Sequence, residues 1–413
     1  MNEEIFDIGI VGGGPAGYTA ALHAAGKGLR VILFEKEYLG GVCLNRGCIP
    51  TKTILHSSQL YYNLSNCEDF GIYANEVTFN WKKVLERKNA VVERLRKGLE
   101  LAFKNAKIKF VNSEAEILDA KNIKSDGKVY PCNKIFCCTG ASPRVVKGLE
   151  FDHKYILSSD DILNIDNIPK SLMIVGSGAI GIEWARVMSN FGVEVTVVEL
   201  AKNLLPLADI EVSKRVERIF KARKIKFYTQ ASVEKIEERR VMLSNGEVIE
   251  PEKILVAVGR VPNTKSKIDG VEYIGDASGE IQLAHYGIKQ AIEKIDGVKF
   301  EKTLTPSVVY GTPEIAWAGV REQDLEPDNY KKSLILTSSL GKAQCDGETE
   351  GFIKLLSKEN KIIGVHIVCA EASALMQQVL VAIQNNISVD KLKETCFAHP
   401  TYSEGIFDAL FRL

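Results

Sequence analysis

The sequence lacks any uninterrupted apolar run of about 18 residues, the length at which a membrane-spanning helix becomes credible. It also lacks a net charge, because 53 Lys and Arg residues balance 53 Asp and Glu residues. A protein that binds nucleic acid or a membrane surface usually carries a large basic excess. We therefore expect neither nucleic acid nor a membrane as a partner.

Cysteine is sparse, with nine residues in 413, and nine is an odd number. This density excludes a secreted scaffold held together by disulfides. The first residues, 1–4, are polar and acidic, whereas a secretory signal needs a basic start and an apolar stretch. We expect a cytoplasmic protein in which most cysteines are buried thiols and any disulfide is catalytic.

Low-complexity sequence is absent too, but one pattern occurs twice. A strand, a glycine turn, a helix and a second strand follow one another in 5–35 and again in 172–199. In both copies the glutamate that ends the second strand lies 23 positions after the first glycine. The pattern predicts an α/β fold with two Rossmann-like dinucleotide-binding domains. The motif glycines are Gly12, Gly14 and Gly17 in the first copy and Gly176, Gly178 and Gly181 in the second.

Each glycine turn would let a pyrophosphate approach the backbone and lie on the N-terminus of the following helix. Glu35 and Glu199 would each accept hydrogen bonds from a ribose diol. A carboxylate repels a 2′-phosphate, so the second site should prefer NAD over NADP. The alternative, glycines that serve only helix–strand packing, is disfavoured because the two copies agree in register.

The rest of the chain carries no third nucleotide motif. Residues 80–105 predict a long charged helix with one apolar stripe. A loop is expected from Pro262 to Thr264. The last hundred residues predict an α+β domain, with strands at 333–337, 352–356 and 362–368 and helices at 372–385 and 403–410.

Two cysteines, Cys43 and Cys48, lie just after the first nucleotide motif. In a regular helix they would be about 140° apart, so a disulfide can close only across an irregular turn, which Gly47 allows. Pro50 suits the first turn of a helix that begins near Cys48, where the helix dipole lowers a thiol pKa. Two unrelated buried thiols are the open alternative. A zinc site is less favoured, because no second pair has ligand spacing, and we expect no metal.

Near the C-terminus, Glu404 follows His399 by five residues. The carboxylate could orient the imidazole and make it a general base, which thiol–disulfide exchange requires. A surface histidine that lies near a glutamate by chance is the alternative. The five other histidines show no comparable partner in the sequence and are expected to be structural; they are His23, His56, His153, His285 and His366.

Together these residues resemble the pyridine nucleotide–disulfide oxidoreductase family, and within it the dihydrolipoamide dehydrogenases. The resemblance covers nearly the whole chain. Its most specific parts are the segments 40–52, 54–58, 176–183, 273–276, 283–285 and 398–404.

The resemblance implies a role for each catalytic residue. Cys43 would be the thiol that meets the substrate, and Cys48 would lie against the flavin of FAD. Lys52 would approach the flavin N5 region and pair with Glu183. His399, with Glu404 beside it, would act in the active site of a partner subunit, so a homodimer is implied.

The resemblance also assigns residues to the two cofactors. Asp276 would hold the ribityl chain of FAD, and Gly259 would line the NAD site. The remaining residues implied at the FAD site are Lys52, Thr139, Gly140, Leu283 and Ala284.

Four domains are implied. They are an FAD-binding domain with the cysteine pair at 1–150, an NAD-binding domain at 151–264, a trimmed central domain at 265–302 and a C-terminal dimerisation domain at 303–413. The central domain is described as trimmed because only nine residues join Thr264 to Ile274, where the family carries a longer segment. The departure puts the orientation of the NAD domain in question.

The implied activity is oxidation of protein-bound dihydrolipoyl groups with reduction of NAD. Its partner would be a lipoyl domain or a lipoyl carrier protein of a multienzyme complex. Two alternatives remain open at this stage: an NADH-dependent reductase of another disulfide, and a flavoprotein paralogue without catalysis.

Overall fold

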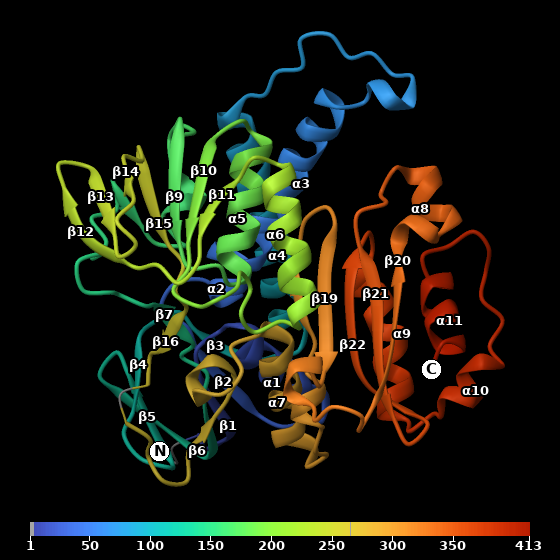
Figure 1. Cartoon of the computed structure of the whole chain (residues 1–413). Coiled ribbons are helices and arrows are strands. Elements are labelled where there is room, and N and C mark those ends of the chain that lie inside the picture. Colours follow the sequence, from blue (N-terminus) through green and yellow to red (C-terminus); the bar gives the residue numbers. More distant parts are fainter. Residues whose placement is uncertain (1–3, 265) are drawn as a thin grey trace.

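The computed structural model describes residues 4–264 and 266–413. Figure 1 shows the N-terminal and second sheets stacked on one side and a third, C-terminal sheet beside them. The first sheet has the order β3-β2-β1-β6-β5-β4, with β17 beside β6. Its strands are β1 (Phe6–Val11), β2 (Val31–Phe34), β3 (Lys109–Val111), β4 (Ala115–Ile117), β5 (Asn122–Ser125), β6 (Lys128–Cys137) and β17 (Glu272–Tyr273).

The second sheet repeats the arrangement of the first. Its order is β11-β10-β9-β15-β8, all parallel. The strands are β8 (Ile156–Leu157), β9 (Ser171–Val175), β10 (Glu194–Val198), β11 (Lys226–Tyr228) and β15 (Lys253–Val256). In both sheets the strand before the glycine turn pairs in parallel with the strand after the helix. The predicted duplication is confirmed.

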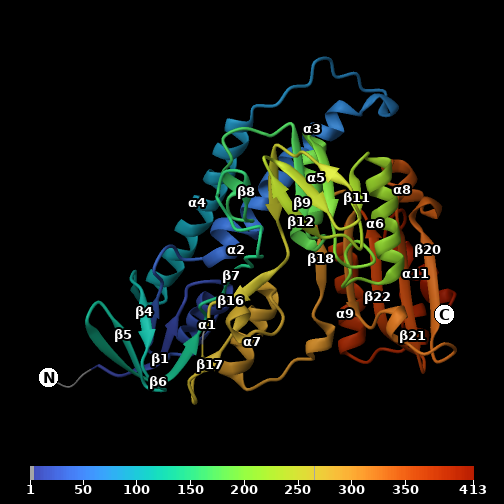
Figure 2. The ribbon, with the colours of Figure 1, turned by 60° about the vertical axis from the view of Figure 1, so that its left-hand side comes forward.

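Helices cover these sheets because the parallel strands are apolar on both faces and must be buried on both. Figure 2 shows α3 and α4 running along one side of the molecule from the first sheet to the second. The helices are α1 (Pro15–Gly26), α3 (Cys48–Ser65), α4 (Trp81–Asn105), α5 (Ala179–Asn190), α6 (Ile210–Ala222) and α7 (Ala284–Asp296). The predicted long helix is α4, and the side chain of Asn80 caps its N-terminus by accepting a hydrogen bond from Lys83 N.

The third sheet is antiparallel, with the order β18-β19-β22-β21-β20. Its strands are β18 (Ser307–Val309), β19 (Glu314–Gly319), β20 (Lys331–Leu336), β21 (Phe352–Lys358) and β22 (Lys361–Cys369). Its helices are α8 (Gly341–Asp346), α9 (Ala372–Gln384), α10 (Val389–Lys393) and α11 (Glu404–Phe411). The predicted strands and helices of this α+β region are confirmed to within two residues at each end.

Two smaller antiparallel sheets complete the fold. One consists of β12 (Val233–Glu237), β13 (Arg240–Leu243) and β14 (Val248–Ile249), and the other of β7 (Ala141–Pro143) and β16 (Arg260–Pro262). The β7–β16 ribbon joins the chain where it enters and leaves the second nucleotide unit. Pro262 still pairs with Ala141 in this ribbon, so the loop predicted from Pro262 begins one residue later than expected.

The segment after this ribbon is short. Lys265, in the predicted 264–274 connection, lies outside the described residues. Within 266–302 the described chain contributes one strand, β17, which extends the first sheet by pairing with β6. The limits of the four predicted domains remain a prediction.

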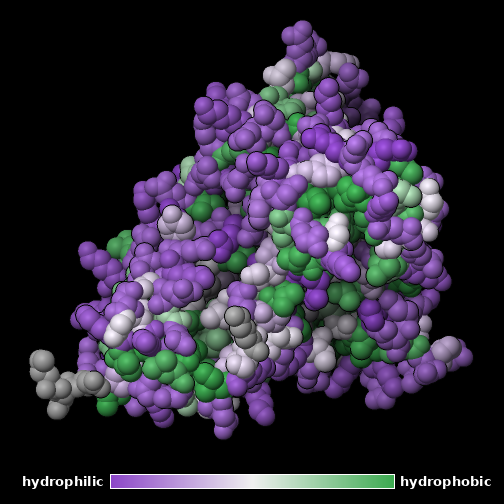
Figure 3. Space-filling model, turned by 90° about the vertical axis from the view of Figure 1, so that its left-hand side faces the viewer, coloured by the Kyte–Doolittle hydropathy of each residue, from purple (hydrophilic) through white to green (hydrophobic). Residues whose placement is uncertain are grey.

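Hydrophilic side chains cover most of the face in Figure 3, with smaller hydrophobic areas between them. Within 4–264 and 266–413, every helix is either too short or too polar to cross a bilayer.

A buried ionic cluster joins the second unit to the C-terminal sheet. Asp209, the N-cap of α6, is fully buried and accepts a hydrogen bond from Lys354 Nζ at 2.7 Å. Lys354 Nζ also lies 2.5 Å from Glu322 Oε2. Burial alone would raise the pKa of Glu322, but hydrogen bonds from Lys332, Lys354 and Tyr330 outweigh it and lower the pKa to about 2.

This depressed pKa predicts a pH-dependent contribution to stability. The unfolded chain binds a proton at Glu322 at higher pH than the folded chain does, so the contribution is complete above about pH 4.5 and is lost as the pH falls towards 2. We expect Glu322→Gln to lower the free energy of unfolding by about 2 kcal/mol at pH 7. The deficit should shrink at pH 3 in chemical unfolding experiments.

The matched control is Glu326→Gln, since Glu326 is exposed and forms no ion pair among the described residues. It should leave the unfolding free energy unchanged at both pH values. An equal deficit for Glu322→Gln at pH 3 and pH 7 would contradict the assignment.

Candidate active site

The two predicted redox cysteines form a disulfide. Cys43 lies in the short helix α2 (Gly41–Arg46), Cys48 is the first residue of α3, and their Cα atoms are 4.7 Å apart. Gly47 separates the helices with non-helical dihedrals, φ −143° and ψ −109°. A Cβ on Gly47 would lie 3.0 Å from Val42 O, so the turn between the two helices is tight. The irregular turn predicted for this pair is confirmed, and both cysteines are half-buried.

Cys48 stands at the N-terminus of an 18-residue helix, and the residue before it, Gly47, provides no side-chain cap. The first backbone N–H groups of a helix have no intrahelical partner and stabilise a negative charge placed there. A thiolate released at Cys48 when the disulfide opens is therefore favoured by its position. Asn45 holds the preceding turn, since its side-chain Nδ2 donates to Leu39 O and Gly41 O at 3.0 and 2.9 Å.

Lys52, one turn after Cys48 on α3, pairs with Glu183 of α5. The distance from Lys52 Nζ to Glu183 Oε2 is 2.8 Å, and the Glu183 side chain is almost completely buried. The predicted partnership across 131 residues of sequence is thus present. Glu183 Oε1 accepts a second hydrogen bond from Tyr310 N at 3.1 Å.

In both glycine motifs, the last glycine is needed for packing and the middle glycine borders open space. A Cβ on Gly17 would lie 1.9 Å from Gly12 O, and one on Gly181 would lie 2.0 Å from Gly176 O. Packing therefore requires a glycine at both positions. The middle glycines differ: a Cβ on Gly14 would meet only Gly41 Cα, at 3.9 Å, and one on Gly178 would meet nothing within 4 Å.

The middle glycines therefore open onto space at the N-termini of α1 and α5. Neither Gly14 nor Gly178 caps its helix with a side chain, so the first N–H groups of both helices face that space. Unpaired helix N–H groups beside a residue without a side chain fit a pyrophosphate. The residues present at both motifs fit a dinucleotide.

The acidic residue of each copy holds its own glycine turn. Glu35 accepts a hydrogen bond from Gly13 N at 2.8 Å. Glu199 accepts from Ser177 N at 2.8 Å and from Ser177 Oγ at 2.6 Å, and only 9% of it is exposed. Sequence reasoning did not foresee this structural task, and the ribose contacts of both glutamates remain a prediction.

The other residues predicted at the first cofactor gather around the same turn. Thr139 and Gly140 lie just beyond the end of β6, after Cys138. The side chain and backbone N–H of Asn263 donate to their carbonyl oxygens at 2.8 and 3.0 Å. Leu283 is the N-cap of α7 and Ala284 its first residue, and α7 packs along α1. Gly259, which was predicted at the NAD site, has a φ of +98° and open space where a Cβ would stand.

Asp276 fits the role predicted for it. Burial raises the pKa of its carboxyl, opposed by the charge of Arg260, and none of the described residues donates a hydrogen bond to the carboxylate. A partly buried acceptor without a protein donor requires an external one, and a polyol chain such as the ribityl of FAD supplies hydroxyl donors.

His399 and Glu404 are brought together as expected. His399 Nδ1 lies 2.8 Å from Glu404 Oε1, and Thr401 N donates to Glu404 Oε2 at 2.8 Å. These hydrogen bonds, first that from His399, lower the pKa of Glu404. The imidazole is 76% exposed, so Nε2 faces outward. Figure 1 shows the strands of the C-terminal sheet between α2, which carries Cys43, and α11, which begins at Glu404.

The expectation for the other histidines needs correction, and one charged side chain of the site was missed. His23 and His153 do have carboxylate partners, Asp296 at 2.8 Å and Asp161 at 3.0 Å. Arg46, between the two cysteines, was missed by sequence reasoning: its guanidinium Nη1 lies 2.5 Å from Glu37 Oε2. A charged residue inside the redox loop was the available signal.

Arg46 also contacts the start of the second unit. Its Nε lies 3.3 Å from Asp160 Oδ2, and Arg260 of β16 lies 3.6 Å from Asp160 Oδ1. Asp160 thus sits between two arginines, one from the redox loop and one from the ribbon. This bridge is the charged contact between the redox loop and the base of the second nucleotide unit.

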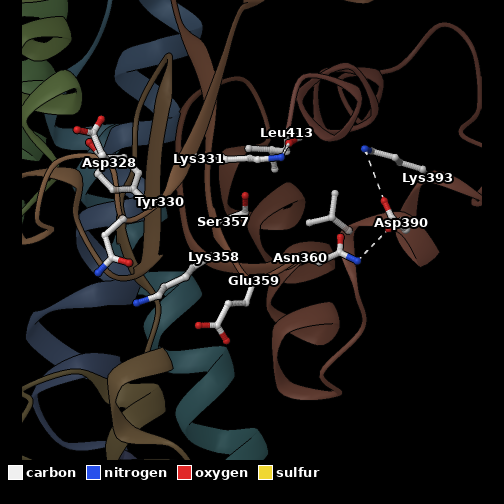
Figure 4. Close-up of a pocket in the computed structure, with 12 residues that line it drawn as sticks. Asp328, Tyr330, Lys331, Ser357, Lys358, Glu359, Asn360, Asp390, Lys393 and Leu413 are labelled. Carbon is white, nitrogen blue, oxygen red and sulfur yellow. Dashed lines mark hydrogen bonds and ion pairs between the residues drawn. The ribbon is translucent and has the colours of Figure 1, made fainter.

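A surface hollow of about 600 Å³ lies in a different part of the molecule, among β20, β21, α10 and the C-terminal residue (Figure 4). Its lining is polar, and Asp390 there is bonded to Asn360 at 2.9 Å and lies 3.9 Å from Lys393. None of the predicted catalytic or cofactor residues lines it.

Comparison with known families identifies the chain at this point. A model described as pyridine nucleotide-disulphide oxidoreductase matches residues 6–295, and the dimerisation domain of the same family matches residues 305–410. The chain belongs to this family. It is an FAD-dependent oxidoreductase that uses NAD.

Individual relatives agree along the whole chain. A dihydrolipoyl dehydrogenase of Mycoplasma pneumoniae is 32% identical over 444 aligned positions, which cover 98% of this chain and 97% of that protein. A dihydrolipoyl dehydrogenase of Bacillus subtilis is 32% identical over 462 positions, with the same coverage. Both alignments are longer than the 413 residues of this chain, so the relatives carry residues that it lacks.

Solved structures share the fold. LpdA from Mycobacterium tuberculosis superposes with a TM-score of 0.91 at 24% identity, covering 98% of this chain and 99% of that one. The HOCl-induced flavoprotein disulfide reductase RclA from Escherichia coli superposes with a TM-score of 0.86, also at 24% identity, with the same coverage. At these identities the likeness bears on the fold alone.

Proposed function

We propose that this chain is a dihydrolipoyl dehydrogenase, which oxidises a protein-bound dihydrolipoyl group and reduces NAD through FAD and the Cys43–Cys48 disulfide. The observation that carries the proposal is that disulfide, closed at the N-terminus of α3 within one turn of the Lys52–Glu183 pair. The relatives that match over 97% of their length bear that name.

The chain supplies the steps on the dithiol side. One substrate sulfur attacks Cys43 Sγ, the Cys43–Cys48 bond breaks, and Cys48 leaves as a thiolate at the helix N-terminus. His399 of the partner subunit takes the proton of the attacking thiol through Nε2. The second substrate sulfur then attacks the mixed disulfide, which releases the oxidised substrate and leaves two reduced cysteines.

When bound, FAD would supply the two-electron chemistry that links the reduced cysteines to NAD. The balance is one dithiol and one NAD⁺ consumed, and one disulfide, one NADH and one proton formed. Glu35, Asp276 and the first glycine turn would hold FAD, and Glu199 with the second glycine turn would hold NAD.

We propose a homodimer as the active unit. The matched dimerisation domain supports it, and so does an exposed apolar face at the end of α3, where Leu60, Phe70 and Tyr73 are 55%, 58% and 77% exposed. This face continues into α8: a Cβ on Gly347 would lie 2.8 Å from the Phe70 ring, and one on Gly341 would lie 4.0 Å from His399 Cε1. A second copy on this face would cover apolar side chains and bury the outward imidazole edge.

The direct test is turnover of dihydrolipoamide with NAD⁺, compared with NADP⁺. We expect activity with NAD⁺ and at least about tenfold less with NADP⁺, because the buried Glu199 carboxylate repels a 2′-phosphate. Glutathione disulfide and coenzyme A disulfide, each assayed with NADH, are the comparison substrates. Faster NADH oxidation with either of these than with lipoamide would overturn the substrate assignment.

A further inference from the structure

The turn between β18 and β19, residues 310–313, lies against the helix that carries Glu183. Its backbone is held by donors from other elements: Arg186 Nη1 donates to Pro313 O at 2.8 Å, and Arg223 Nη2 donates to Thr312 O at 3.0 Å. In the opposite direction, Tyr310 N donates to Glu183 Oε1 at 3.1 Å. The C-terminal sheet is therefore fastened to α5 beside the Lys52–Glu183 pair.

Arg186 is an unusual residue for this position. It lies three residues after Glu183 on α5, only 1% of it is exposed, and its Nε and Nη2 have no hydrogen-bond partner. No carboxylate of the described chain lies within 4.0 Å of its guanidinium. Burial, with the nearby charge of Arg223, lowers its pKa to about 9, so it remains protonated at pH 7. Burying a guanidinium without a close counter-ion is costly and needs an explanation.

Gly311 provides the space for this side chain. Its φ is +140°, and a Cβ there would lie 2.6 Å from Arg186 Nη1 and 2.8 Å from Arg186 Cδ. The side chain of Arg186 thus occupies the space that a side chain at position 311 would need. Any larger residue at position 311 would push the guanidinium away from the carbonyl oxygens that it binds.

The turn places Tyr310 against the catalytic lysine. The centre of the Tyr310 ring is 4.8 Å from Lys52 Nζ, while Glu183 bridges the Tyr310 backbone and the Lys52 ammonium. A cation over an aromatic face is stabilised and shielded from water. Both partners of Lys52 therefore depend on where the turn lies.

We propose that Arg186, seated in the space left by Gly311, is a positioning residue that holds the Tyr310 turn over the Lys52–Glu183 pair and so sets the charge environment of the flavin site. The proposal rests on the proposed function for the identity of that site. Arg186 acts through Tyr310 and Glu183 and needs no contact with substrate or cofactor.

The variants separate position from charge. Arg186→Met removes the charge and the hydrogen bonds that hold the turn. Arg186→Lys keeps the charge without the planar guanidinium. Gly311→Ala keeps the charge but places a Cβ in the space that the guanidinium occupies. Gly192→Ala is the matched control for backbone strain, since Gly192 also has a positive φ, +82°, with nothing within 4 Å of a Cβ. The readouts are kcat and KM for dihydrolipoamide, the reduction potential of the bound flavin and thermal stability.

We expect Arg186→Met and Gly311→Ala to lower kcat about tenfold with KM changed less than about twofold, because the lysine loses its placed partners. The flavin potential should fall by about 30 mV, which corresponds to a tenfold change for a two-electron couple. Arg186→Lys should recover part of both effects. Gly192→Ala should match the wild type in potential and kcat.

A double variant tests the fit even if a parent is poorly folded. In Arg186→Ala with Gly311→Ala, the added Cβ no longer meets a guanidinium, so the potential should equal that of Arg186→Ala alone. Additive shifts, or a wild-type potential in Gly311→Ala, would overturn the proposal. The potential is measured without dithiol or NAD, so wild-type protein inactive on dihydrolipoamide would defeat the proposed function and leave this test intact.

Discussion

Replacing Cys48 with Ser is expected to reduce the turnover of dihydrolipoamide and NAD⁺ by at least about 1,000-fold. A dithiol cannot attack the remaining Cys43 thiol, because the disulfide bond that receives the electron pair no longer exists. The hydroxyl of a serine at the N-terminus of α3 also stays protonated at neutral pH and cannot replace the thiolate. The measurement is steady-state NADH formation under anaerobic conditions.

Loss of turnover in this variant must be separated from loss of structure. NADH should still bleach the flavin of Cys48→Ser, since that half of the reaction uses the second glycine turn and not the disulfide. Cys345→Ser is the control, because Cys345 is an exposed free cysteine on α8. Retained dihydrolipoamide turnover in Cys48→Ser would falsify the proposed reaction.

Substituting His399 by Gln should lower turnover about 1,000-fold, the scale of a lost general base. Glutamine keeps a polar side chain near Glu404 but cannot take the proton of the attacking thiol. Glu404→Gln should cost less, since the imidazole stays and loses only the carboxylate that orients it through Nδ1.

Cys48→Ser and His399→Gln together test whether the active site is shared between two subunits. If His399 serves the disulfide of the partner, a mixed dimer of Cys48→Ser and His399→Gln contains one intact site out of two. Random association of equal amounts makes half of the dimers mixed, so unfolding and refolding the two variants together should restore about a quarter of the wild-type activity. Activity that stays at the level of the separate variants would show that the histidine does not act across the interface.

Local patterns predicted much of this fold correctly. The strands β1, β2, β9 and β10 are mostly apolar, and a glycine turn directly follows β1 and β9; such strands are typical of parallel sheets buried on both faces. The long helix α4 followed from its apolar stripe, and the irregular turn at Gly47 followed from the angular offset of the two cysteines. Each of these features depends on residues close together in the chain.

Other features could not be predicted because they join residues far apart in sequence. Arg186 and Gly311 are 125 positions apart, and neither shows a pattern until the C-terminal sheet lies against α5. The binding of Ser177 N–H by Glu199 and the contact of Arg46 with Asp160 are likewise products of packing. The ribbon of β7 and β16 was not predicted, and Pro262 at its end was expected in a loop, because three-residue strands carry almost no periodic signal.

The sequence by itself determined the chemistry available to this protein: two glycine turns in register, a cysteine pair beside the first and a histidine with its glutamate at the end. Spacing alone encodes these, since each is set by dihedrals and offsets within a few residues. Only the tertiary structure decided that Arg46 meets Asp160 and that Arg186 binds the backbone of the Tyr310 turn. Electrostatic pairing depends on distance in space, which the order of residues along the chain does not specify.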